Sequence, residues 1–225
     1  MKIVFIRHLK TPGNEKRQYI GRTDEELADR AVKDFLLRFT GACNEDRARC
    51  RESGRTGIVR DRSTSSLYPP AQHIIASPMK RCIRTAELIY PGQEIRTEPM
   101  LRECDFGEYE QKTYEELRNE PEYIRWIKSG GMTAFPGGED PAAFRRRCMA
   151  GAEKWIGILL RKEADSAAFI VHGGTVMAVL SELSEDTHGF YHWQVENGGG
   201  YEASVREEEW MNGRKYLEEV RRISA

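Results

Sequence analysis

The feature that most constrains this fold is a set of short apolar segments that each end abruptly in polar residues. Segments 2–6, 73–76 and 168–171 contain β-branched or aromatic residues and are followed by Arg-His, Ser-Pro and His-Gly-Gly. Short buried runs separated by stretches with helical spacing are typical of parallel strands covered by helices. We therefore predict an α/β fold: a three-layer sandwich with a mostly parallel central sheet flanked by helices.

The remaining elements are predicted from local start and stop signals. The run Thr23-Asp24-Glu25-Glu26 resembles a capping box and predicts a helix over about 25–39. Ser77-Pro78 predicts the N-cap and first residue of another helix. Asn212-Gly213 predicts the turn of a C-terminal hairpin. Further predictions are a strand at 94–97, a helical region at 113–129 interrupted at Pro121, and a long helix from Asp140-Pro141.

Composition limits the classes of protein to which the chain can belong. Its 225 residues are 39% hydrophobic and 32% charged, with a formal net charge of -1, which is a globular balance without the basic field of a nucleic-acid-binding protein. No apolar run approaches the roughly 20 residues that span a bilayer. The first apolar run is too short for a signal peptide, so we expect a cytoplasmic protein with no membrane or nucleic-acid partner.

We expect one domain over residues 1–225, with a loop insertion at about 40–70 that is rich in glycine, serine and arginine. The five cysteines include no C-x-x-C pair, so we expect free thiols rather than a zinc site. His188 and His192 have helical spacing, but Gly189 lies between them and no third ligand motif follows. We therefore predict no metal site.

Polar residues gather where the predicted strands end. If the three strands are parallel neighbours, Arg7, His8, Arg81 and His172 meet at one edge of the sheet. Arginine binds phosphoryl oxygens in a bidentate manner, and a neutral imidazole can attack phosphorus. Nearby cations keep an imidazole neutral. Gly173 would let the backbone approach a phosphate at a helix start. The sequence therefore predicts phosphoryl transfer with His8 as the nucleophile.

Five segments with distinctive polar and glycine residues occur in order along the chain. They are Arg7-His8-Leu9-Lys10-Thr11 with Asn14, Ser77-Pro78-Met79-Lys80-Arg81 with Thr85-Ala86-Glu87, Leu101-Arg102-Glu103 with Phe106-Gly107 and Tyr109-Glu110, Pro136-Gly137-Gly138-Glu139, and Val171-His172-Gly173-Gly174. In this order they resemble the R-H-G-x-T-x-x-N, S-P-L-x-R-A-x-x-T-A-E, L-x-E-x-x-F-G-x-W-E-G, P-G-G-E and V-x-H-G-G segments of the histidine phosphatase superfamily, which includes the cofactor-dependent phosphoglycerate mutases.

The resemblance implies a phosphoglycerate mutase-like fold and a role for each matching residue. His8 would be the phosphorylated nucleophile, and Glu103 would donate a proton and later act as the base for water. The residues that would hold the phosphoryl oxygens are Arg7, Arg81 and His172. The residues that would contact phosphate or substrate are Asn14, Gly21, Thr23 and Gly173. The implied reaction needs no metal or other cofactor, and its partner would be a small-molecule phosphate ester.

Three functions remain open, and the first is preferred. A phosphomonoester hydrolase is favoured because Glu103-Cys104-Asp105-Phe106-Gly107 differs from the E-R-H-Y-G form that mutases usually carry. Among small family members, α-ribazole phosphatases resemble the chain in length and in the F-G-x-W-E segment. The alternatives are a cofactor-dependent phosphoglycerate mutase and a non-catalytic phospho-ligand-binding module. The natural substrate and the oligomeric state are left open by the sequence.

The chain also departs from the family pattern. Leu9 and Lys10 stand where a glycine and a common acidic residue are usual, and Gln111 replaces the glycine after Glu110. A larger residue at position 9 would alter the backbone beside the nucleophile. These departures affect the expected substrate rather than the expected chemistry, because the four pocket residues and the acid are all present.

Overall fold

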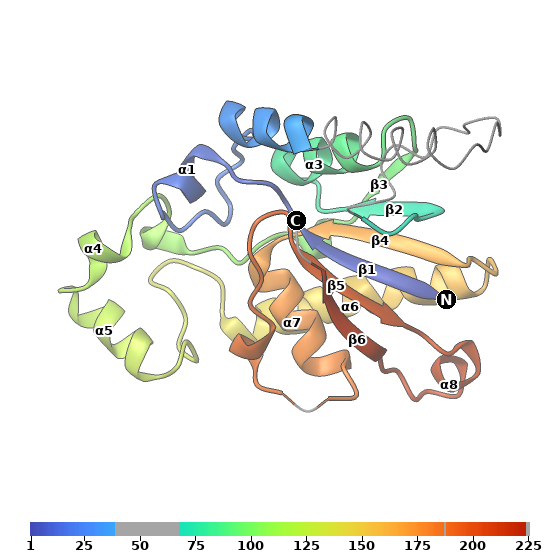
Figure 1. Ribbon diagram of the computed structural model, residues 1–225. Coiled ribbons are helices and arrows are strands. Elements are labelled where there is room, and N and C mark those ends of the chain that lie inside the picture. Colours follow the sequence, from blue (N-terminus) through green and yellow to red (C-terminus); the bar gives the residue numbers. More distant parts are fainter. Residues whose placement is uncertain (39–67, 187, 224–225) are drawn as a thin grey trace.

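The computed structural model describes residues 1–38, 68–186 and 188–223, with a six-stranded sheet at its centre (Figure 1). The strands are β1 (Lys2–Arg7), β2 (His73–Ala76), β3 (Ile95–Thr97), β4 (Ser166–Val171), β5 (Gly200–Ser204) and β6 (Glu218–Ile223). They lie in the order β3-β2-β4-β1-β5-β6. The first four pair in parallel, whereas β5 pairs antiparallel with both β1 and β6. The prediction of a mostly parallel sheet is confirmed.

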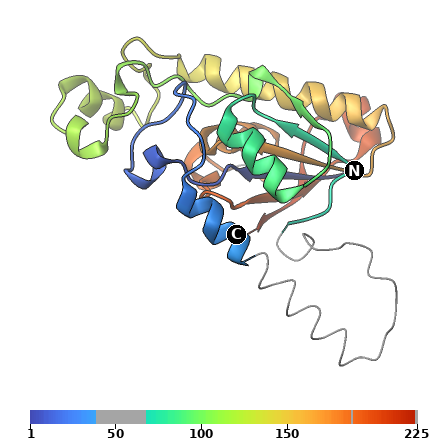
Figure 2. The ribbon, with the colours of Figure 1, turned by 90° about the horizontal axis from the view of Figure 1, so that it is seen from above.

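Helices cover both faces of this sheet. The α-helices of the described residues are α1 (Pro12–Glu15), a helix at 29–38, α3 (Lys80–Ile89), α4 (Tyr114–Leu117), α5 (Pro121–Lys128), α6 (Pro141–Leu160), α7 (Gly173–Leu183) and α8 (Glu207–Met211), of which α4 and α5 lie away from the sheet (Figure 1). The helix at 29–38 and α3 lie on one face, and α6 and α7 lie on the other (Figures 1 and 2). The predicted break at Pro121 and the predicted long helix after Asp140 are both confirmed. No described helix has both the length and the apolar character needed to cross a membrane.

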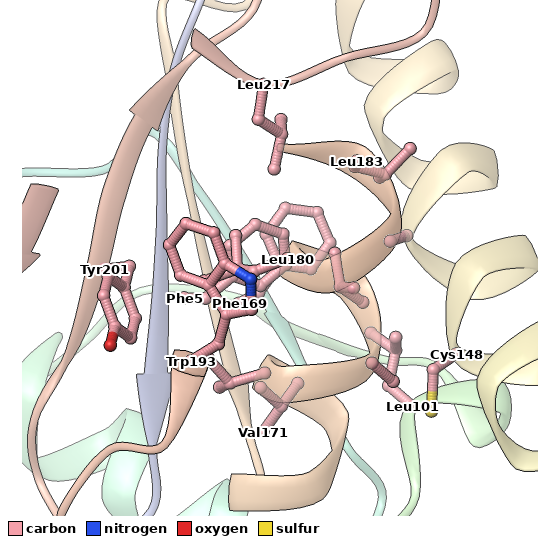
Figure 3. Packing of buried hydrophobic residues seen from close by; sticks show 14 of the residues in the cluster. Phe5, Leu101, Cys148, Phe169, Val171, Leu180, Leu183, Trp193, Tyr201 and Leu217 are labelled. Atoms are coloured by element: carbon pink, nitrogen blue, oxygen red, sulfur yellow. The ribbon is translucent and has the colours of Figure 1, made fainter. Parts of the chain in front are cut away.

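Alternation along the strands separates two hydrophobic cores. Ile3 and Phe5 of β1 belong to the cluster that α6 and α7 cover, whereas Val4 and Ile6 belong to the cluster that α3 covers. Figure 3 shows the first cluster, in which Phe5 stacks on Phe169 of β4 with ring centroids 4.9 Å apart. A strand whose two faces are both buried must be apolar throughout, which is why β1 and β4 read as continuous hydrophobic runs.

The predicted helix over about 25–39 begins later, at residue 29, and residue 39 lies outside the described residues. The acidic side chains of the capping-box-like run bind other helices instead. The Asp24 carboxylate accepts a hydrogen bond from the Lys80 backbone N–H at the start of α3, and the Glu25 carboxylate accepts one from the Gly13 N–H in α1. A helix N-terminus attracts any nearby carboxylate, including one from another segment.

Two further local predictions are wrong. Helix α3 begins at Lys80 with Met79 as its N-cap, because the Ser77 hydroxyl is hydrogen-bonded to His172 rather than to the helix start. The predicted hairpin turn at Asn212-Gly213 is wrong, because residues 207–211 form α8, with three glutamates in its first turn, and the antiparallel pair is formed by β5 and β6 on either side of it. Gly213 follows α8 with φ +87°, so the Asn-Gly pair marks a helix end. The predicted insertion at 40–70 lies almost wholly outside the described residues.

Candidate active site

Three neighbouring strands bring their carboxyl ends together. β4 lies between β1 and β2, and all three run in parallel. The backbone N–H of His8 donates to Val171 O at 2.9 Å, and that of Ser77 donates to Ile170 O at 3.0 Å. The side chains that follow these strands, Arg7, His8, Arg81 and His172, form what we call the histidine–arginine pocket. The sheet register therefore places the four residues together, as the sequence predicts.

The His8 ring is held in one tautomer. Its Nδ1 lies 2.7 Å from the carbonyl oxygen of Leu9, which can only accept a hydrogen bond. Nδ1 must therefore carry the proton, and Nε2 keeps its lone pair. Burial lowers the pKa of His8 well below its usual value, and the positive charges of Arg81 and Arg7 lower this pKa further. The ring is thus neutral, with Nε2 as its nucleophilic atom.

His172 is held in the opposite tautomer. The Arg81 Nε–H donates to Nδ1 of His172 at 3.2 Å, so the proton of the neutral ring is on Nε2, which lies 2.8 Å from the Ser77 hydroxyl. Burial, and secondarily the charge of Arg81, lower the pKa of His172 well below its usual value. The His172 ring packs edge-on against that of His8, with centroids 5.2 Å apart. Ser77 therefore fixes this ring, a role that its sequence context did not reveal.

Arg81 is fully buried, and backbone carbonyls orient it. Its Nη1 and Nη2 donate to Thr23 O at 2.7 Å and Gly21 O at 2.8 Å. The amides of this loop in turn bind the Glu110 carboxylate, which accepts bonds from the N–H groups of Gly21 and Thr23 and from the Thr23 hydroxyl. Glu110 also accepts from the backbone N–H of Phe106. Gly21 and Thr23 thus position Arg81, and Glu110 holds their loop.

Arg7 combines an anchored guanidinium with a spare donor. Its Nη1 donates to Val195 O at 2.8 Å, while its buried Nε has no hydrogen-bond partner among the described residues. Leaving a buried charged donor unpaired is costly, so the position favours an anionic ligand. Gly173 lies against this guanidinium, because a Cβ there would be 3.3 Å from Arg7 Cζ. A side chain at position 173 would therefore crowd Arg7.

Glu103 lies in a loop rather than on a strand, close enough to Arg7 and Arg81 for their charges to act on its carboxyl group. Its carboxylate accepts hydrogen bonds from the Gly174 N–H and the Cys104 N–H, both at 3.0 Å. Burial raises the pKa of Glu103 above its usual value, although these two hydrogen bonds and the nearby Arg7 and Arg81 oppose the rise. A carboxyl group with a raised pKa can carry a proton for transfer.

Arg147 of α6 holds the backbone of the Glu103 loop. Its guanidinium donates to Met100 O at 2.7 Å, to Arg102 O at 2.9 Å and to Glu103 O at 3.3 Å. Glu139, from the Pro136–Glu139 segment, accepts from Nε and Nη2 of the same arginine at 2.9 and 2.7 Å. The Arg147–Glu139 pair was not among the predicted site residues. Its signal in the sequence was the glutamate of the P-G-G-E segment.

Asn14 is connected to the histidine–arginine pocket through Asn197 rather than by direct contact with it. Its Oδ1 accepts from the Thr11 N–H, which closes the capping box of α1, and from Nδ2 of Asn197 at 3.1 Å. Asn197 also donates to the carbonyl oxygen of His8 at 3.0 Å. Asn197 is thus a link between Asn14 and the nucleophile that no sequence motif indicated.

Leu9, the departure beside the nucleophile, is accommodated by the core. Its side chain is buried in the α3-side cluster with Leu27 and Phe35. Its N–H donates to the Thr85 hydroxyl, and its carbonyl oxygen binds His8. The larger side chain therefore points into the hydrophobic core, and the backbone at position 9 still orients the His8 ring.

Two cavities meet at Glu103. The polar cavity has a volume of about 340 Å³ and is lined by Gly21, Arg22, Met79, Arg102, Glu103, Asp105, Gly137, Gly138, Glu139 and Arg147. The aromatic cavity has a volume of about 190 Å³ and includes Glu103 and Gly174 in its lining. The Glu103 carboxyl group therefore lies between a charged space and an apolar one.

The family model of the histidine phosphatase superfamily (branch 1) matches residues 65–217, which is well over half of the chain. This chain belongs to the histidine phosphatase superfamily. The matched range begins after the Arg7-His8 segment, so the match does not include His8.

Individual superfamily members with similar sequences or folds carry both phosphatase and mutase names. A "Putative phosphoserine phosphatase 2" of Hydrogenobacter thermophilus is 24% identical over 81% of this chain and 78% of its own length. A "Probable phosphoglycerate mutase GpmB" of Yersinia enterocolitica is 29% identical over 81% and 74%. The structure of a putative alpha-ribazole-5'-P phosphatase from Escherichia coli aligns with a TM-score of 0.72 at 18% identity, covering 100% of this chain and 96% of that one.

Proposed function

We propose that this protein is a metal-independent phosphomonoesterase that acts on a small phosphorylated metabolite through a phosphohistidine at His8. The observation that carries the proposal is the pairing of His8 Nδ1 with Leu9 O beside the guanidinium groups of Arg7 and Arg81. This arrangement leaves Nε2 of a neutral ring as the atom that can attack phosphorus. The branch 1 match and the phosphatase names among similar proteins support the same reaction.

In the first step, Nε2 of His8 bonds to phosphorus while the ester P–O bond breaks. The guanidinium groups of Arg7 and Arg81 stabilise the charge on the phosphoryl oxygens, and His172, whose Nδ1 accepts from Arg81, orients the Arg81 guanidinium. The protonated Glu103 gives its proton to the departing alkoxide oxygen. The phosphorylated ring becomes more acidic at Nδ1–H, and its hydrogen bond to Leu9 O stabilises that form.

In the second step, the Glu103 carboxylate takes a proton from water, and the oxygen of that water attacks phosphorus. The P–N bond breaks, inorganic phosphate leaves, and both His8 and Glu103 return to their starting forms. The raised pKa of Glu103 suits both duties, because the group can be protonated in one step and ionised in the next.

The proposal is tested by trapping the phosphoenzyme. We expect hydrolysis of p-nitrophenyl phosphate in the presence of a metal chelator, and an acid-labile, base-stable phosphoenzyme after rapid quenching. His8→Ala should abolish both signals without loss of folding, as judged by circular dichroism. Hydrolysis that persists in His8→Ala would overturn the assignment of the nucleophile. A folded protein that hydrolyses no phosphate ester between pH 5 and 8 would instead indicate a phospho-ligand-binding module.

A mutase remains the second candidate, favoured by the similarity to the protein named phosphoglycerate mutase GpmB. In that reaction the same phosphohistidine would return its phosphoryl group to a sugar acid instead of to water. Incubation with 3-phosphoglycerate and its bisphosphorylated primer distinguishes the two reactions. We expect release of inorganic phosphate to exceed isomerisation, and rapid isomerisation would reverse the order of the two candidates.

A further inference from the structure

The aromatic cavity beside Glu103 has no role in the steps above. Its lining is Tyr19, Glu103, Cys104, Phe106, Trp126, Gly131, Phe135, Pro141, Phe144, Arg145, Gly174, Met177, Phe190 and Tyr191. The wall includes edge-to-face and tilted ring pairs, with the Phe135 centroid 4.9 Å from that of Trp126 and 5.1 Å from that of Phe106. Aromatic walls of this kind bind planar apolar groups through dispersion and ring-edge contacts.

The position of the cavity determines which part of a substrate can enter it. The phosphoryl group must reach Nε2 of His8, and the ester oxygen must lie beside Glu103 to receive its proton. Glu103 and Gly174 both line the aromatic cavity, and the Gly174 N–H donates to the Glu103 carboxylate. The atoms attached to the ester oxygen are therefore next to this space.

Two of the four arginines that line these cavities are paired with carboxylates, which lessens the attraction of this region for an anionic leaving group. In the polar cavity, Arg147 is paired with Glu139 at 2.7 Å, and Arg22 is paired with Asp105 at 3.4 Å. In the aromatic cavity, the Arg145 guanidinium lies 4.4 Å from the centroid of the Phe190 ring. Among the described residues, Arg102 and Arg145 have no carboxylate partner, but Arg145 lies over a ring face and the rest of the aromatic wall is apolar, which suits a neutral ring.

The volume of the aromatic cavity limits the size of the leaving group that it can hold. An apolar cavity of about 150 Å³ holds benzene in another protein, and this one is about 190 Å³. We propose that the aromatic cavity receives the leaving group of the substrate, and that this leaving group is a neutral alcohol bearing one aromatic ring or two fused rings. This inference deepens the proposed phosphomonoesterase activity and rests on it for the position of the phosphoryl group.

The test compares phosphate esters whose leaving alkoxides are similar. We expect 2-phenylethyl and 3-phenylpropyl phosphate to exceed ethyl and propyl phosphate in kcat/KM by roughly ten- to a hundredfold, the range expected from burying one aromatic ring. 3-Phosphoglycerate should be hydrolysed no faster than propyl phosphate. Equal rates for the aryl-alkyl and alkyl esters would overturn the inference and leave the phosphatase activity intact.

Substitutions of residues that line the aromatic cavity test whether this cavity causes the preference for aryl-alkyl over alkyl phosphates. Tyr191 lines the cavity and is 53% exposed, so Tyr191→Ala should fold normally and lower the aryl-to-alkyl ratio at least about threefold. Tyr114→Ala is the matched control, because Tyr114 is 54% exposed and does not line the cavity. Met177→Gln adds a polar group of similar shape and should lower the ratio while leaving ethyl phosphate hydrolysis unchanged. A ratio that both cavity variants leave intact would contradict the inference.

A binding measurement separates this inference from the proposed function. Isothermal titration of His8→Ala with 3-phenylpropyl phosphate and with propyl phosphate requires no turnover. Tighter binding of the aromatic ester, weakened in the His8→Ala, Tyr191→Ala double variant, would support the cavity even if no ester were hydrolysed. Equal affinities would refute the cavity assignment whatever the outcome of the phosphatase assays.

Discussion

The histidine–arginine pocket and the Glu103 loop (residues 101–111) supply opposite halves of the proposed reaction, yet the protein holds them in different ways. His8, Arg7 and His172 follow strands at the centre of the sheet, so register and core packing fix them. Glu103 lies in a loop, where hydrogen bonds from Arg147 hold its backbone and that of its neighbours. The comparison suggests that phosphate binding is built into the sheet, whereas acid positioning depends on a few side chains.

The largest effect is expected at Arg81. Arg81→Lys removes the planar fork that reaches Gly21 O, Thr23 O and His172, so kcat/KM should fall about a hundredfold or more. The affinity for inorganic phosphate should fall as well. Arg84→Lys is the control, because Arg84 lies on the same helix and is half exposed beside Glu87. A loss of activity with unchanged phosphate affinity would argue that Arg81 does not hold the phosphoryl group.

Glu103→Gln tests the other half of the comparison. We expect kcat/KM for an alkyl phosphate to fall about a hundredfold, and that for p-nitrophenyl phosphate to fall much less, since p-nitrophenolate leaves without a proton. The affinity of the histidine–arginine pocket for inorganic phosphate should be retained. Equal losses for the two esters would show that Glu103 does not protonate the leaving group.

The pH dependence of kcat/KM should also separate the contribution of His8 from that of Glu103. Activity requires a neutral His8, whose lowered pKa keeps the ring uncharged to below pH 6.5, and a protonated Glu103, whose raised pKa extends that form to higher pH. The value of kcat/KM for an alkyl phosphate should therefore rise through the His8 pKa, peak between the two pKa values and fall through the Glu103 pKa. The alkaline fall should disappear with p-nitrophenyl phosphate. If kcat/KM for p-nitrophenyl phosphate fell in the same way at alkaline pH, the fall would have to be assigned to a group other than Glu103.

A smaller effect on activity is expected for substitution of Arg147, which contacts the Glu103 loop and not the histidine–arginine pocket. Arg147→Ala should lower kcat for an alkyl phosphate about tenfold, because Glu103 loses its fixed position. Phosphate affinity should stay the same, since the histidine–arginine pocket keeps its own supports. Arg146→Ala, an exposed neighbour on α6, serves as the control. Weaker phosphate binding in Arg147→Ala would show that the two halves are not independent.

The smallest effect on activity is expected for substitution of Glu110, which belongs to the Glu103 loop and binds the segment that positions Arg81. Glu110→Gln replaces a carboxylate that accepts from Gly21, Thr23 and Phe106, so it should destabilise the fold by about 2 kcal/mol. The activity should fall only a few-fold, through a looser Arg81. Thermal unfolding and phosphate titration measure the two effects. An unaltered melting temperature would contradict the supporting role of Glu110.

Much of the site could be predicted because its chemistry follows strand ends. The runs that become β1, β2 and β4 are apolar on both faces, which fixes them as buried parallel strands with polar residues at one edge. The supporting residues could not be predicted in this way. Ser77, Glu110 and Asn197 act through partners more than 60 positions away in the sequence, and local propensity assigned Ser77 to a helix start.

The same reason explains the errors in the secondary structure. Asp24 and Glu25 have the local pattern of a cap, but the helix starts to which they bind belong to α3 and α1. Asn212-Gly213 fits a hairpin turn and a helix end equally well, and only the helical α8 before it decides between them. A short polar motif indicates which kind of hydrogen bond a residue can make, but it does not indicate the partner residue.

The sequence alone determined the four parallel strands, the family resemblance and the identity of the four residues in the histidine–arginine pocket, because apolar periodicity and strand ends are local properties. Only the tertiary structure decided the tautomers of His8 and His172, the raised pKa of Glu103 and the presence of an aromatic cavity beside it. Each of these depends on which groups lie within a few ångströms after folding, and the spacing of residues along the chain does not contain that information.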